Sequence, residues 1–166
     1  MSIKPAGVAL LLLCAAALTA CSSVAPSNDL NSGAHELLDQ EAAEARLDRL
    51  VEHFLDLVPQ DGDDPLVDRI SDDVALSCSA RAAQTSRFID VRPSMEKGRD
   101  EVVREVASSL RESRELELEV EVQSDIRGDA RLIARETETG ASIVMSQRAM
   151  PLFQITAYSP CYSTQG

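Results

Sequence analysis

Glutamate and aliphatic residues alternate strictly along eight positions of this chain, from Glu115 to Val122. Successive side chains of a strand point to opposite faces, so this period of two predicts a half-buried β-strand. Its aliphatic face would lie on a core and its glutamate face in water. This pattern restricts the fold more than any other in the sequence.

A second alternating segment follows, in which Ala130, Leu132 and Ala134 are interleaved with Arg131 and Arg135. A turn at Ser124–Gly128 would fold the two segments into an antiparallel hairpin. The predicted cross-strand pairs are Val120 with Leu132, Glu121 with Arg131, and Glu117 with Arg135. Each such pair contributes roughly 0.2–1 kcal/mol, and a one-residue slip would place charges in the core, so the register is well specified.

Two helices are predicted from apolar residues spaced three and four apart, over His35–Val58 and Arg99–Glu112. The apolar stripe of the first helix is Leu38, Ala42, Ala45, Leu47, Leu50, Val51, Phe54 and Val58, and that of the second is Val102, Val103, Val106, Ala107 and Leu110. Ser32 can cap the first helix and Pro59 can end it. The remaining expected strands are Val74–Cys78, with Cys78 on the apolar face, Ser86–Val91, one around Ile143 and Met145, and one around Phe153, Ile155 and Ala157. The order α-β-(β)-α-β-β-β-β predicts an α+β two-layer sandwich, a curved antiparallel sheet of about five or six strands on two helices.

The first twenty residues have the layout of a secretory signal: a polar start with Lys4, an apolar run from Ala6, and small residues before Cys21. The run is shorter than the roughly 20 residues that a helix needs to cross a bilayer. Leu18-Thr19-Ala20-Cys21 resembles the lipobox of bacterial lipoproteins. The resemblance implies cleavage before Cys21 and attachment of diacylglycerol to its thiol. The alternative is an ordinary cleaved signal with an incidental cysteine.

The expected organisation is therefore a signal peptide over 1–20, a lipidated flexible tether over 21–34 and one domain over 35–166. Two acyl chains anchor a protein stably without a basic patch, which predicts a lipid-anchored location on the extracytoplasmic face of the cell membrane. Loss of Lys4 with the signal changes the formal charge from −12 to −13. So acidic a chain is unsuited to nucleic acid, whose phosphates require Lys and Arg.

After removal of Cys14 and lipidation of Cys21, two cysteines remain, Cys78 and Cys161. An even pair in an exported domain predicts a disulfide. Two cysteines without a nearby histidine make a poor zinc site, and Cys78 has no companion base that would make it a nucleophile.

The lipobox together with the Ser159-Pro160-Cys161 ending resembles small lipoproteins of high-GC Gram-positive bacteria. That group largely lacks an assigned function, so the resemblance implies only an extracytoplasmic location and the Cys78–Cys161 disulfide. Asp72-Asp73-Val74 and the segment from Gly98 to Val103 also resemble the steroid-isomerase-like (nuclear-transport-factor-like) cone fold. Enzymes of that fold use an ionisable residue in an apolar pocket.

The remaining motifs do not match the zinc-protease, calcium-binding or glycosidase patterns that they partly resemble. His35 and His53 would lie about 27 Å apart along one helix, and Asp39 stands where a zinc-protease motif starting at His35 needs its second histidine. The acidic loop Gln60–Asp68 has Pro65 and Leu66 where a calcium-binding loop needs a ligand and a glycine. The glutamates of 115–121 could hold an acid and a base for glycoside cleavage, but a solvated face with arginine partners is favoured.

The sequence thus predicts a membrane-tethered, non-enzymatic module that binds or supports another envelope component. We expect it to be a monomer without a cofactor, a metal or a nucleic-acid partner, and its ligand-binding residues are unknown. The alternative is a small cone-fold surface enzyme or ligand carrier. That alternative requires a closed apolar pocket containing a buried carboxylate or Tyr158.

Overall fold

The computed structural model describes residues 37–60, 66–94, 96–149 and 151–164. The predicted signal, Cys21, the tether, Ser32 and His35 lie outside these residues. The elements are α1 Gln40–Asp56, β1 Val67–Ile70, β2 Val74–Ser79, β3 Ala82–Val91, α2 Arg99–Glu112, β4 Leu118–Ser124, β5 Ala130–Glu136, β6 Ser142–Gln147, β7 Phe153–Tyr158 and β8 Tyr162–Ser163. The α+β class and the element order are confirmed, and β1 and β8 are additional strands in the eight-stranded sheet.

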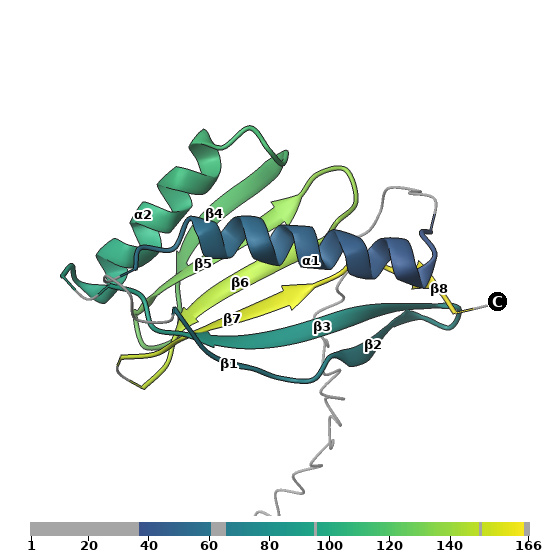
Figure 1. Ribbon diagram of the computed structural model, residues 1–166, viewed down its shortest axis with the longest axis horizontal. Helices are drawn as coiled ribbons and strands as arrows, with labels where there is room; N and C mark the ends of the chain where they lie inside the picture. The colour runs from purple at the N-terminus through teal and green to yellow at the C-terminus, as the bar shows by residue number, and fades with distance from the viewer. Residues whose placement is uncertain (1–36, 61–65, 95, 150, 165–166) are drawn as a thin grey trace, which may run out of the picture.

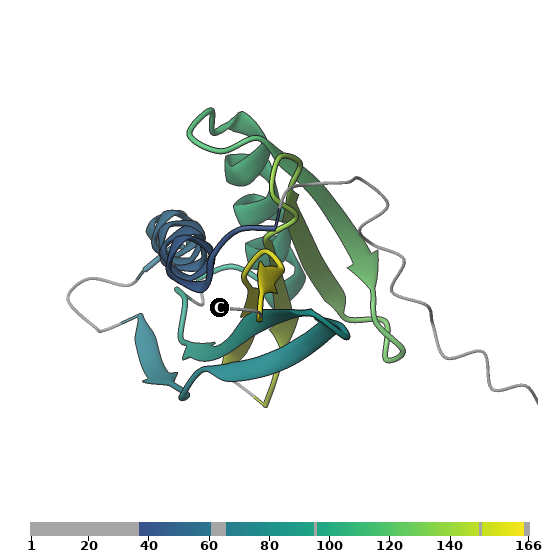
Figure 2. The same ribbon diagram turned by 90° about the vertical axis from the view of Figure 1, so that its right-hand side faces the viewer.

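The sheet is antiparallel and curved, and both helices lie on its concave side (Figures 1 and 2). Its strand order is β1-β3-β7-β6-β5-β4, with β2 and β8 also paired to β3. One edge is therefore formed by β1 and β2, and the other by β4. No helix among the described residues is long and apolar enough to cross a membrane.

Helix α1 buries the predicted stripe of Leu47, Leu50, Val51 and Phe54 against the sheet. It begins at Gln40, not at His35 as predicted, because the side chain of Asp39 accepts a hydrogen bond of 2.7 Å from the Ala42 amide. In the first two turns Ala43 is buried, whereas Ala42 and Ala45 are exposed, contrary to the prediction.

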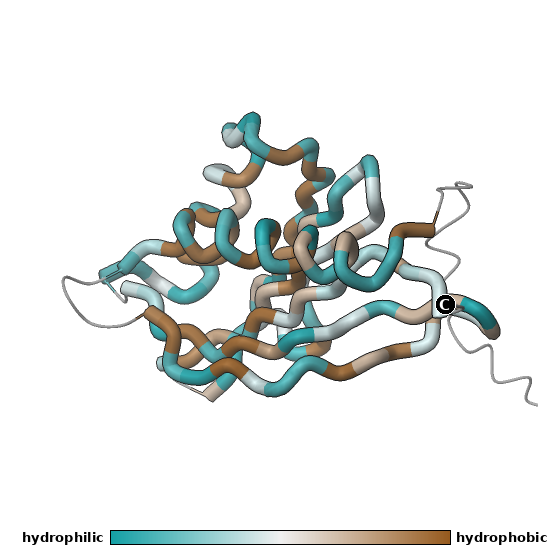
Figure 3. The backbone as a smooth tube through the Cα atoms, turned by 45° about the vertical axis from the view of Figure 1, so that its right-hand side comes forward, coloured by the Kyte–Doolittle hydropathy of each residue, from teal (hydrophilic) through white to brown (hydrophobic). Residues whose placement is uncertain are grey.

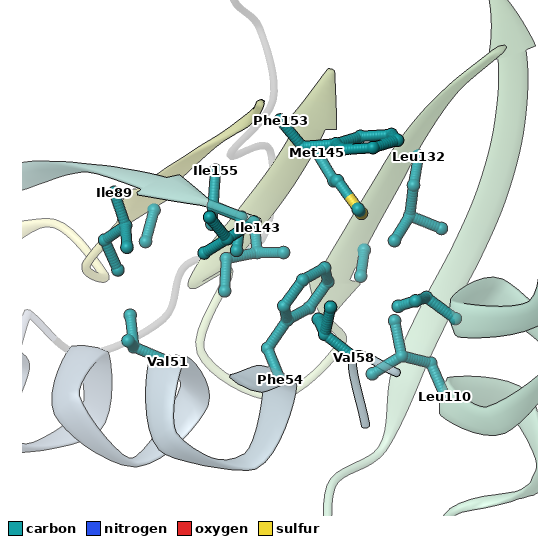
Figure 4. Close-up of a cluster of buried hydrophobic side chains, with 14 of the residues drawn as sticks. Val51, Phe54, Val58, Ile89, Leu110, Leu132, Ile143, Met145, Phe153 and Ile155 are labelled. Atoms are coloured by element: carbon teal, nitrogen blue, oxygen red, sulfur yellow. The ribbon is translucent and has the colours of Figure 1, made fainter. Parts of the chain in front are cut away.

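Helix α2 has the predicted bounds and buries all five predicted apolar residues: Val102, Val103, Val106, Ala107 and Leu110. These side chains and those of α1 meet the concave side of β5, β6 and β7 in one core (Figure 4). Phe54, Met145 and Phe153 fill its centre without exposure to solvent.

The β4–β5 hairpin keeps its predicted faces but not its predicted pairs. Val120 pairs with Ala134, Val122 with Leu132 and Glu119 with Arg135, a shift of two residues from the prediction. The turn is centred one residue later than predicted, because the Asp125 amide bonds the Asp129 carbonyl at 2.9 Å and Gly128 adopts a φ of +85°. A shift of two preserves the side-chain faces, so the same aliphatic residues still point to the core.

Strand β2 is exposed along its whole length. Val74 and Leu76 are 46% and 37% exposed, so the apolar face on which the sequence places Cys78 is not buried. The physical reason is the position of β2 at the sheet edge (Figure 1). Hydrophobic segments therefore also occur in the outermost strands of the sheet (Figure 3). Cys78 is joined to Cys161 by the expected disulfide, with Cα atoms 6.3 Å apart.

Candidate functional site

The convex face of the sheet is the side opposite both helices (Figure 2). A row of paired residues crosses its centre from β3 to β4: Phe88, Thr156, Val144, Ile133 and Glu121. Phe88 is 36% exposed, and the three central residues are half-buried. The row therefore offers an apolar centre with an acidic end.

A parallel row on the same face runs through Ser86, Tyr158, Ser142, Arg135 and Glu119. Tyr158 follows the buried Ala157, so its side chain points to the convex side. A cone-fold enzyme would place Tyr158 in an internal pocket, whereas here Tyr158 lies on the open convex face.

Among the described residues two carboxylates are nearly buried, and both belong to ion pairs. Glu136 is 2% exposed, and its Oε2 accepts a 2.8 Å hydrogen bond from the Nε of Arg46 on α1. Its Oε1 contacts the same guanidinium, and the Thr139 hydroxyl also donates to its Oε2. The hydrogen bond to Glu136 raises the pKa of Arg46. On the convex side Asp90, 7% exposed, accepts a 3.0 Å bond from Arg148.

Arg87 joins three segments through a similar network. Its guanidinium makes two 2.7 Å hydrogen bonds to Asp73, before β2, and one of 2.7 Å to Asp48 on α1. These contacts raise the pKa of Arg87, and the hydrogen bonds to Asp73 make the largest contribution. The guanidinium in turn lowers the pKa of Asp73. The network fixes the start of β2 to the body of the domain.

Ser113, His53 and Glu115 form a hydrogen-bonded relay that sequence reasoning missed. The Nε2 of His53 lies 3.0 Å from the Oγ of Ser113, and its Nδ1 lies 2.9 Å from a carboxylate oxygen of Glu115. His53 is 8% exposed on α1, whereas the Glu115 side chain is 78% exposed. A serine, a histidine and a carboxylate linked in this order are the elements of a nucleophilic centre.

An open groove of about 470 Å³ lies between α2 and the end of β4. Asp100, Arg104 and Arg111 line it from the helix, and Val122 and Gln123 from the strand. Hydrogen bonds from the Ala130 amide and the Gln147 side chain lower the pKa of Asp100. Arg111 in turn bonds the Val120 carbonyl. Both of these charged side chains of the groove therefore already have hydrogen-bond partners within the chain.

The remaining sequence candidates are dispersed. Within the described part of the chain, no three His, Cys, Asp or Glu residues are grouped to hold a metal ion. Asp68 is the acidic residue of the predicted loop that the structure describes; it lies in β1, not in a loop as predicted, and pairs with Arg92 at 2.8 Å. Glu119 and Glu121 point to the exposed face of β4. Comparison of the chain with protein-family models, curated proteins and solved structures gives no match.

Proposed function

We propose that this protein is a lipid-anchored extracytoplasmic module that works by binding another component of the cell envelope. The observation that carries the proposal is the Leu18-Thr19-Ala20-Cys21 motif behind a short apolar segment. The resemblance of this motif to a lipobox implies a diacylglycerol anchor on Cys21, and two acyl chains hold a protein stably at a membrane.

Cell fractionation of a Cys21→Ala variant tests the anchor. The variant is expected in the soluble fraction, with a matched Cys14→Ala variant remaining in the membrane fraction because Cys14 lies inside the apolar segment. A Cys21→Ala protein that still sediments with membranes would contradict the anchor.

The convex face supports a binding role. An antiparallel sheet covered on one side can present its other side to a partner, and here the Phe88–Thr156–Val144–Ile133 row gives that side an apolar centre. A photo-crosslinking residue at position 88 should capture a specific envelope protein in intact cells. The same residue at Glu52, on the exposed side of α1, should not capture it. Equal capture from both positions would argue against this face.

A second candidate, a small surface enzyme, is favoured by the Ser113–His53–Glu115 relay. With Nδ1–H donating to Glu115, the His53 Nε2 can accept the Ser113 proton. Ser113 Oγ would then bond the carbonyl carbon of an ester. His53 would pass the proton to the departing alcohol, and water would release the acid from the acyl-serine.

A fluorophosphonate probe distinguishes this candidate from a binding module, because it labels serines activated by a base. A hydrolase should be labelled, and Ser113→Ala should abolish the label. Ser108→Ala, which changes an exposed serine five residues earlier on α2, should leave it intact. An unlabelled wild-type protein removes the enzyme candidate.

A further inference from the structure

The two edges of the sheet have opposite chemistry. At the β4 edge, Glu119 and Glu121 are exposed, and Arg111 donates a 3.1 Å hydrogen bond to the outward carbonyl of Val120. Charged side chains and occupied backbone groups are the usual means of preventing another strand from adding to an edge. The β4 edge is therefore protected.

The β2 edge has neither protection over Val74–Ser77, the part of the strand that precedes a bulge between Ser77 and Ser79. Its six residues, Val-Ala-Leu-Ser-Cys-Ser, include no charge although 27% of the chain is charged, and all six are exposed. Large apolar side chains stand on this edge at Val74 and Leu76. The strand is nevertheless held in place, by pairing with β3 and by the Cys78–Cys161 disulfide. An uncharged, apolar and fixed edge is suited to strand addition.

The hydrogen-bonding pattern shows which backbone groups of β2 are open. Thr85 of β3 bonds Ser159 on the β7 side through both its amide and its carbonyl, at 2.8 Å each. Backbone groups of neighbouring strand residues point in opposite directions, so Gln84 and Ser86 point toward β2. Their partners Leu76 and Val74 therefore bond β3, and Ala75 and Ser77 direct their amide and carbonyl groups away from the sheet.

We propose that β2 pairs antiparallel with β2 of a second copy of this chain, about a twofold axis at Leu76. In this register Ala75 of each copy bonds Ser77 of the other, and the two Leu76 side chains meet on the convex face. The axis is perpendicular to the sheet, so each face of one copy continues into the same face of the other. The two convex faces then form one surface.

The charges at the ends of β2 favour a second copy over another occupant. Asp72 lies two residues before β2 and Arg81 two residues after it, and antiparallel pairing brings the start of each strand next to the end of the other. Asp72 and Arg81 are both exposed, and the twofold axis brings this acid and this base together twice. A contact between two acidic molecules is thus centred on their uncharged strand and bordered by opposite charges. The small contact implies a weak dimer, favoured where copies are concentrated on a membrane.

This arrangement departs from the monomer predicted from the sequence, and the pairing itself does not require the lipid anchor. Failure of the anchor in the fractionation experiment would therefore leave the dimer testable. Failure of the dimer would in turn leave the anchor intact.

Cysteine crosslinking of the full chain in membranes tests the register. Leu76 would face its copy as a non-hydrogen-bonded pair, with Cα atoms about 4.5 Å apart, a distance that a disulfide spans. Mild oxidation of Leu76→Cys should give a covalent dimer on a non-reducing gel at least about tenfold faster than oxidation of Glu119→Cys on the protected edge. Equal rates overturn the proposal.

Two further changes, each made in the Leu76→Cys background, separate strand pairing from simple proximity. Ser77→Pro removes an amide that faces away from β3, which an edge strand tolerates, and should slow the crosslinking about tenfold or more. Asp72→Arg should also slow it, and adding Arg81→Asp should restore it. Crosslinking that is unaffected by Ser77→Pro, or an adduct of the Leu76→Cys variant with a different protein in place of the dimer, refutes pairing with a second copy.

Discussion

Removal of Arg46 should destabilise the domain more than its position near the surface suggests. Arg46→Met leaves the Glu136 carboxylate, 2% exposed, without the guanidinium that contacts both its oxygens. Breaking one side of a buried ion pair typically costs about 3–5 kcal/mol, because an uncompensated charge stays out of water. The Arg46 side chain is 21% exposed, so water can reach the vacated space. We therefore expect a loss near the lower end of that range, about 3 kcal/mol.

Urea unfolding at neutral pH, followed by circular dichroism, measures this loss. The double variant Arg46→Met/Glu136→Met should recover most of it, because an apolar pair can replace a buried ion pair at little cost. Glu138→Ala removes the exposed arm of the same cluster, whose side chain is 77% exposed, and should cost less than about 1 kcal/mol. A loss below about 1 kcal/mol for Arg46→Met, with an unchanged slope against urea, would refute the assignment of a buried charge.

Three other changes give independent checks. Reduction of the Cys78–Cys161 bond, whose cysteines are 83 positions apart, should lower stability by up to about 4.5 kcal/mol in urea unfolding with and without reductant. Asp73→Asn should cost less than about 1 kcal/mol. Because Arg87 lowers the pKa of Asp73 in the folded state, that cost is present above about pH 4 and shrinks in unfolding measured at lower pH. Phe54→Ala should cost about 3–5 kcal/mol at its fully buried site, against under about 1 kcal/mol for the exposed Phe88→Ala.

The sequence predicted the fold best where one face of an element is buried. The bounds of α2 and the faces of β4 to β7 follow from such patterns, because apolar periodicity reports which side is removed from water. The start of α1 was missed because periodicity does not choose between possible caps, and Asp39 caps the helix at Gln40. The β4–β5 pairs were shifted because alternation fixes faces but leaves the position of the turn open.

The candidate sites differ in how much the sequence could indicate. The disulfide follows from counting cysteines in an exported chain. The relay does not, because His53 and Ser113 are 60 positions apart and meet only through the packing of the two helices and the chain after α2. The one available signal was the placement of His53 in the apolar stripe of α1, beside Phe54, where a buried imidazole requires hydrogen-bond partners.

The most informative departure concerns β2, since its alternating apolar residues are typical of a half-buried strand and the strand is exposed. A position that contributes little to the core should tolerate a charge, so Leu76→Lys is expected to change the free energy of unfolding by less than about 0.5 kcal/mol. The same change places two ammonium groups at the proposed twofold axis and should abolish dimers in sedimentation of the full chain. A variant that unfolds more easily would mean that Leu76 supports the fold, and one that still dimerises would exclude pairing through β2. If the Leu76→Lys variant no longer dimerises and its stability is unchanged, the apolar side chains of this edge serve binding and not folding.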